Sequence, residues 1–171
     1  MADSLLERFE RSLVPLMDDA YTLARYLVHD EHDAQDVVQE AYLRAWRFFA
    51  GFRGGDERAW LLSIVRNCCY TWRQKCRPGV QSVEYDDTQH GGDERSELTA
   101  DARMLAESNR QELALALEQL PIEMREVIVL REIEEMSYQE IARVTGVPMG
   151  TVMSRLARAR QRLQRALKLS A

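Results

Sequence analysis

The sequence predicts an all-α protein: two small helical domains joined by an acidic flexible linker, with a helix-turn-helix in the C-terminal domain. Apolar residues recur at intervals of three or four along most of the chain, the period of an amphipathic helix. Strand-like alternation is scarce, and eight glycines and four prolines are few for the turns of a β-sandwich or barrel. The length of 171 residues is enough for one ordinary domain or two small ones.

Three helices are expected in the N-terminal half. The first spans about residues 5–28, and the second spans about 33–49 after a break at 29–33 that supplies its N-cap. Paired glycines predict a loop over 52–56, and a third helix follows over about 57–76. Trp46, Trp60 and Trp72 each lie on an apolar stripe and are expected in the core.

Helical periodicity disappears between residues 78 and about 100. Residues 84–101 contain seven acidic residues and one basic residue, with too little apolar surface to offset the entropy of ordering. We therefore expect a linker at 79–105, between one domain at 1–78 and another at 106–171. In the second domain, helices are expected over about 102–119, from 121 to beyond 130, over 137–144 and over 148–168.

The net charge of −5 conceals blocks of opposite sign. Residues 1–40, 41–80, 81–120 and 121–171 carry net charges of −7, +6, −7 and +3, and residues 141–171 hold seven bases and no acid. Two basic segments separated by acidic ones indicate two nucleic-acid contacts. From charge alone, chance clustering on solvated helix faces stays open as the alternative.

Residues 137–160 have the spacing of a helix-turn-helix. Ser137 and Glu140 form a capping-box pattern, and Ala142 is a small residue suited to the close approach of two helices. Gly146 permits a left-handed turn, and Val152 supplies a branched apolar residue on the second helix. That helix then carries arginines, which can bind phosphate or guanine. A plain helical hairpin with a solvated basic face is the alternative.

A second basic face is expected on the helix over 57–76. It lies opposite the stripe that contains Trp60 and Trp72, and its side chains are Arg66, Asn67, Tyr70, Arg73, Gln74 and Arg77. Cationic, aromatic and amide groups together suit melted DNA, because they offer charge, a stacking plane and hydrogen bonds to a splayed base. Ordinary exposed residues would give the same pattern.

The sequence shows no catalytic constellation and no metal-ligand spacing, so we expect no enzyme and no cofactor. Cys68, Cys69 and Cys76 are crowded within nine residues, away from the histidines, which predicts buried thiols and neither a disulfide framework nor a zinc site. No apolar run approaches the ~18 residues of a membrane span, and the acidic start is unlike a signal peptide. A cytoplasmic protein without membrane insertion is expected.

Two groups of motifs carry a family resemblance. The first group is DAQDVVQE at 33–40, RAW at 44–46 and WLLSIVRN at 60–67. The second group is LP at 120–121, REV at 125–127, SYQEIA at 137–142, GTVMSRL at 150–156 and RAR at 158–160. They resemble the second and fourth conserved regions of extracytoplasmic-function (ECF) sigma factors of the sigma-70 family, in the same order.

The resemblance implies a sigma factor that directs promoter-specific transcription initiation, in a stress- or signal-responsive regulon. The implied partners are core RNA polymerase, promoter DNA and an anti-sigma factor. The implied polymerase contacts are Asp36, Val37, Gln39, Glu40 and Arg44. The implied minus-ten contacts are Phe52, Arg53, Asp56, Arg66, Asn67, Tyr70 and Arg73, and the implied minus-thirty-five contacts are Pro148, Thr151, Met153, Ser154, Arg155 and Arg158.

Three points stay open at this stage. In the family the linker leads toward the RNA exit path, but a solubilising tether is an alternative. Many family members carry a base where this chain has Met153, so this residue makes either an apolar contact or none. The alternative functions are a sigma-like adaptor that titrates a regulator, which would be expected to lose the basic final helix, and a conventional helix-turn-helix repressor, which would not need the acidic face at residues 36–40.

Overall fold

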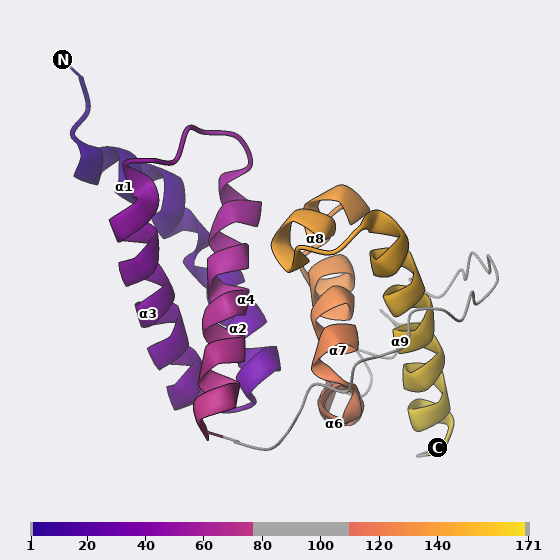
Figure 1. Ribbon diagram of the computed structural model, residues 1–171. Coiled ribbons are helices and arrows are strands. Elements are labelled where there is room, and N and C mark those ends of the chain that lie inside the picture. The colour runs from indigo at the N-terminus through magenta and orange to yellow at the C-terminus, as the bar shows by residue number, and fades with distance from the viewer. Residues whose placement is uncertain (1, 77–109, 170–171) are drawn as a thin grey trace. The chain divides into compact units, whose positions relative to one another are not determined.

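The computed structural model describes residues 2–76 and 110–169, and all regular structure within these ranges is helical (Figure 1). Two compact units form, one centred on α1 to α4 and the other on α6, α7 and α9. The first contains α1 (Leu5–Leu13), the 3-10 turn η1 (Val14–Leu16), α2 (Met17–Val28), α3 (Glu31–Phe49) and α4 (Glu57–Cys76). The second contains α6 (Arg110–Gln119), α7 (Ile122–Ile128), the π-helical turn η2 (Val129–Ile133), α8 (Tyr138–Thr145) and α9 (Met149–Leu169).

The predicted all-α class is confirmed. The linker predicted at 79–105 and the first part of the helix predicted over 102–119 lie outside the described residues. No helix in the described part of the chain is long and apolar enough to cross a membrane.

The prediction of one helix over 5–28 is wrong, because the α-helix is interrupted at Pro15. Proline has no backbone N–H and its ring clashes with the preceding turn, so a 3-10 turn separates α1 from α2. α2 ends at Val28, and its C-cap His29 has a left-handed backbone with φ 64°. Asp30 then caps α3 as expected: its carboxylate accepts the N–H of Asp33 at 3.0 Å, and this bond lowers the pKa of Asp30.

The helices α2, α3 and α4 pack against one another around an aliphatic core. Its buried side chains come from all three helices and include Leu23, Leu27, Val37, Ala41, Leu61 and Val65. These residues recur every three or four positions, so the periodicity of the sequence is the origin of this packing.

Aromatic rings join α1, α3, the loop after α3, and α4. Phe9 meets Trp46 and Phe49 edge to face, at 5.2 and 5.3 Å between ring centroids. Phe52 from the loop stacks on Trp60 at 4.5 Å and lies 6.3 Å from Phe49. The predicted burial of Trp46 is wrong: its side chain is 40% exposed, because it lies at the margin of the buried stripe of α3.

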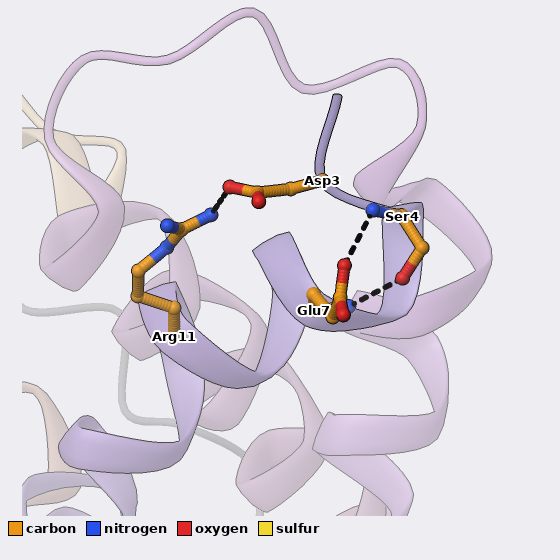
Figure 2. A network of polar contacts seen from close by, with 4 residues as sticks. All are labelled: Asp3, Ser4, Glu7 and Arg11. Carbon is orange, nitrogen blue, oxygen red and sulfur yellow. Dashed lines mark hydrogen bonds and ion pairs between the residues drawn. The ribbon is translucent and has the colours of Figure 1, made fainter. Parts of the chain in front are cut away.

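Both ends of α1 are fixed by hydrogen bonds. At its start, the Ser4 hydroxyl accepts the N–H of Glu7 at 3.2 Å and the Glu7 carboxylate accepts the N–H of Ser4 at 2.8 Å (Figure 2). These bonds with Ser4 lower the pKa of Glu7, and Arg11 forms an ion pair with Asp3 beside them. At its end, the Tyr42 phenol donates to the Leu13 carbonyl oxygen at 2.6 Å. Burial raises the pKa of Tyr42 to about 12, so the phenol keeps the proton that it donates.

A buried guanidinium fixes the corner between α6 and α7. Arg125 donates from Nε to the Leu117 carbonyl oxygen at 2.8 Å, and from Nη2 to those of Glu118 and Leu120 at 3.0 and 2.8 Å. Carbonyl groups at a helix end lack partners within the helix, and the guanidinium supplies them here. Pro121 follows as the N-cap of α7, one position before the place expected for it.

The helices α8 and α9 form the predicted helix-turn-helix (Figure 1). The Ser137 hydroxyl accepts the N–H of Glu140 at 3.1 Å, which caps α8. Gly146 has φ 74°, so the turn uses the left-handed conformation for which glycine was expected. α9 buries Val152, Leu156 and Ala159, which determines the face that it leaves exposed.

We predict that Arg125→Lys destabilises the C-terminal unit. Lysine keeps the charge, but its ammonium cannot reproduce the planar fork that reaches three carbonyl groups. The expected loss is about 1–3 kcal/mol of unfolding free energy, measured by far-ultraviolet circular dichroism in urea. All three tryptophans precede residue 77, so their fluorescence reports the N-terminal unit and should not change. The exposed Arg162→Lys is the matched control, and an equally stable Arg125→Lys would contradict the structural role.

Candidate functional site

The polymerase contacts implied for α3 share one exposed face, with one exception. Asp36, Gln39 and Glu40 are exposed, and Arg44 is half-buried and pairs with Glu40 at 3.1 Å between Nε and Oε1. The exception is Val37, which the structure buries in the core of the unit. Its place one position after Asp36 turns it inward, so it supports the helix and does not present a contact surface.

The same face contains a residue that the sequence analysis missed. Leu43 is 52% exposed, three positions after Glu40 and seven after Asp36, which is the spacing of one helix face. The sequence contains the signal for Leu43, because the helical spacing of Asp36 and Glu40 reaches it when it is continued by one turn. We call Asp36, Gln39, Glu40, Leu43 and Arg44 the α3 surface.

The loop between α3 and α4 contains exposed and anchored residues. Arg53, Gly54 and Gly55 are exposed, and both glycines have positive φ, 85° and 109°, which side chains other than glycine rarely adopt. Phe52 is half-buried in its stack on Trp60. Asp56 caps α4, since its carboxylate accepts the N–H of Ala59 at 3.0 Å. Residues 53–55 are therefore the accessible part of this loop.

Five of the six residues of the basic face predicted on α4 lie on the described helix. The Arg66 guanidinium lies 4.1 Å from the centroid of the Tyr70 ring, and its Nη1 donates to Asn67 Oδ1 at 3.4 Å. Arg73 lies three positions further on, with a half-buried side chain, and Gln74 is exposed. Arg77, the last member of the predicted face, lies outside the described residues.

The implied contacts on the last helix lie near its N-terminal end. Pro148 and Met153 are exposed, and Thr151, Ser154, Arg155 and Arg158 are half-buried. The Ser154 hydroxyl donates to the Thr151 carbonyl oxygen at 3.1 Å. The five arginines of α9 form a basic row: Arg155, Arg158, Arg160, Arg162 and Arg165. Arg160 has a structural role, because it pairs with Glu132 of η2 at 2.8 Å and both side chains are largely buried.

No metal-binding cluster of three or more histidine, cysteine or acidic residues occurs within the described ranges. Cys68 and Cys69 are buried, and burial raises the pKa of the Cys68 thiol. Cys76 is exposed, so the prediction of three buried thiols is wrong for this one. It is the last residue of α4, beyond the part of the helix that packs against α2 and α3.

Comparison with known proteins identifies the family. Residues 14–77 match the family model of sigma-70 region 2, and residues 110–168 match that of sigma-70 region 4. The chain is 38% identical over 135 residues to the ECF RNA polymerase sigma-E factor of Escherichia coli (strain K12), covering 75% of this chain and 71% of that protein. The chain belongs to the ECF sigma factors of the sigma-70 family. This sigma factor therefore directs promoter-specific initiation of transcription, as the resemblance implied.

Other relatives and solved structures agree with the family. This sigma factor is 34% identical over 150 residues to the ECF RNA polymerase sigma factor SigE of Mycolicibacterium smegmatis, covering 86% of this chain and 56% of that one. The fold is similar to that of the sigma factor RpoE of Bartonella quintana, solved with the anti-sigma factor NepR, at a TM-score of 0.71 and 29% identity over 96% of this chain and 99% of that one. It is also similar to CnrH, solved with the cytosolic domain of CnrY, at a TM-score of 0.68 and 27% identity over 97% and 91% of the two chains.

We predict that the capping role of Asp56 can be separated from a DNA contact by substitution. Asp56→Ala removes the cap of α4 and should lower the unfolding free energy of the N-terminal unit by about 0.5–2 kcal/mol, measured by tryptophan fluorescence in urea. Asp56→Ser restores a capping oxygen without the charge, and should restore both stability and promoter melting. A stable serine variant that fails to melt a promoter would show instead that the carboxylate contacts DNA.

Proposed function

We propose that this sigma factor binds core RNA polymerase and the minus-ten element through residues 1–78 and the minus-thirty-five element through residues 106–171. The observation that carries this proposal is the contrast between two exposed helix faces. The α3 surface contains two carboxylates, one amide, one leucine and one arginine that pairs with Glu40, whereas α9 has five arginines, one lysine and no acid. An acidic face repels phosphate and suits a protein partner, and a basic helix in a helix-turn-helix suits DNA.

The α3 surface is the proposed contact with the polymerase. Asp36 and Glu40 would oppose a basic surface on the partner, and Leu43, one turn after Glu40 on the same face, provides an apolar group for the contact. Trp46 and Phe48 are also exposed on α3 and could extend the apolar part of the interface. Val37 acts from the core, as a support for the helix.

The loop and the basic face of α4 are the proposed contacts with the minus-ten element. Strand separation needs groups that bind the backbone and receive unstacked bases. Arg53, Arg66 and Arg73 supply charge, Asn67 supplies an amide, and Tyr70 supplies an aromatic ring. Phe52 and Asp56 act as positioning residues, because the first anchors the loop on Trp60 and the second caps α4.

The N-terminal turns of α9 are the proposed reader of the minus-thirty-five element. In a helix-turn-helix these turns enter the major groove, which brings Thr151, Ser154 and Arg158 to base edges or phosphates. Arg155, on the adjacent side of the same helix face, would bind the DNA backbone or a guanine. Arg162 and Arg165 follow more than a turn later and would meet phosphate.

The remaining assignments follow from family membership. We propose that the protein has no catalytic activity of its own, needs no cofactor and acts in the cytoplasm, where polymerase and promoters are found. An anti-sigma factor is a proposed partner, because the structurally similar sigma factor RpoE was solved with the anti-sigma factor NepR. Such an inhibitor should compete with core polymerase in a binding experiment. Reconstituted transcription on genomic fragments tests the whole proposal, since discrete start sites that share two spaced elements are expected.

We predict that Asp36→Arg with Glu40→Arg weakens binding to core RNA polymerase at least tenfold in a fluorescence binding titration. Two charge reversals on one exposed face oppose the basic surface that the proposal requires. Neither residue is in the core, so tryptophan-monitored stability should remain close to that of the parent. Glu10→Arg with Asp18→Arg makes the same change in net charge on α1 and α2, and should leave binding almost unchanged. Equal affinities for the two double variants would show that the surface is misassigned.

We predict different effects for two arginines of α9. Arg158→Ala should cost about 1–3 kcal/mol on the cognate upstream element and relax the preference at one base position, because this side chain can reach a base edge. Arg165→Ala should weaken binding to all sequences slightly and reduce the salt dependence. Transcription from a promoter library measures both effects. A change of preferred bases in Arg165→Ala but not in Arg158→Ala would reverse the assignment.

A further inference from the structure

Two methionines are exposed at the start of the recognition helix. Met149 and Met153 are 37% and 47% exposed, and their spacing of four places them on the same side of α9. The other exposed positions of α9 are glycine or polar: Gly150, Gln161, Arg162, Arg165 and Lys168. The methionines therefore form a short apolar strip on a helix whose other exposed side chains are polar or cationic.

The two methionines are not part of the core of the domain. The core contacts of α9 come from Val152, Leu156 and Ala159, which follow a different line along the helix. A single exposed apolar side chain is ordinary on a protein surface. Two side by side, in the turns that enter the groove in a helix-turn-helix, lie where a base-reading group is needed.

The chemistry of methionine limits what such a strip can recognise. Its thioether is only a weak acceptor and it has no donor, so it cannot read a guanine edge as arginine does. Among base edges in the major groove, the 5-methyl group of thymine is the apolar feature that side chains contact. An unbranched, flexible side chain adapts well to such a small apolar target.

We propose that Met149 and Met153 determine sequence specificity by covering thymine methyl groups in the minus-thirty-five element. The proposal rests on the proposed function, in which α9 reads this element. The surrounding arginines supply attraction to phosphate that is the same for every sequence, and the methionines supply a preference for thymine. This assigns an apolar contact to Met153, the position whose role the sequence left open, and adds Met149 to it.

The test removes one methyl group at a time from the DNA. Holoenzyme is reconstituted from core polymerase and the full chain, and its preferred upstream element is selected from a randomised promoter library. Each thymine of that element is then replaced by deoxyuridine, which keeps every polar group and lacks only the methyl. At one or two positions the concentration for half-maximal promoter binding should rise about fourfold, as expected for one buried methyl group.

Variants connect the effect to the two side chains. In Met153→Ala or Met149→Ala, the replacement of thymine by deoxyuridine should not change the concentration for half-maximal binding at the position that the missing side chain covers. Met153→Leu should keep most of the sensitivity to this replacement. Met17→Ala is the matched control, since Met17 is 46% exposed on α2 and should leave the sensitivity unchanged. Thermal unfolding confirms that each variant is folded.

Three results would overturn the inference. They are a selected element without thymine, a parent protein insensitive to every deoxyuridine, and sensitivity that survives in both alanine variants. A holoenzyme with no upstream sequence preference would instead overturn the proposed role of α9 itself, and the inference with it. Because selection precedes replacement, the two failures are distinguishable.

Discussion

The packing of Phe49 at the end of α3 is the contact on which both candidate surfaces of the N-terminal unit depend. Its buried ring meets Phe9 of α1, Phe52 of the loop and Trp60 of α4 at 5.3, 6.3 and 6.4 Å. The α3 surface lies earlier on the same helix, and the exposed glycines follow Phe52 in the loop. One group of rings therefore fixes the loop relative to the α3 surface. A substitution within this group would disturb polymerase and DNA binding together, so only exposed residues can separate the two activities.

A comparable constraint operates in the C-terminal unit, with polar groups in place of rings. Arg125 holds the end of α6, and the pair between Glu132 and Arg160 joins η2 to α9. A largely buried ion pair adds little net stability, because desolvation offsets most of the attraction. It does favour one rotation of α9 about its axis, since other rotations would leave two charges unpaired. Together with the buried line of Val152, Leu156 and Ala159, the pair sets which side chains α9 presents.

Most helices could be predicted because their periodicity is a direct consequence of burial on one face. Periodicity does not report backbone breaks, and it missed the 3-10 turn at Pro15, although proline itself was a sufficient signal. Nor does it report how wide the buried stripe is. Trp46 was therefore misjudged, because the neighbours that would cover it come from elsewhere in the chain. Val37 is buried in α3, and it was named as a contact by the family resemblance and not by periodicity.

The candidate site was predictable as a set of surfaces and not as a set of roles. The family resemblance grouped Phe52 and Asp56 with Arg53, because all belong to one loop. Only the structure separates a ring stacked on Trp60 and a helix cap from an exposed arginine. Arg160 belongs to the basic row by spacing, yet its partner Glu132 is 28 residues away in the sequence. Contacts of this kind depend on tertiary packing, which local pattern does not contain.

Affinity for DNA and specificity for a sequence come from different side chains of α9, and this division explains the composition of the helix. Attraction between arginine and phosphate acts at long range and is nearly the same for every DNA sequence, so more arginines would raise affinity without improving discrimination. Discrimination requires short-range groups that fit one base edge better than another. A helix that must choose a promoter therefore needs uncharged side chains among its arginines. Thr151, Ser154 and the two exposed methionines are in the N-terminal turns where such groups can act, and Arg162, Arg165 and Lys168 continue the charge beyond them.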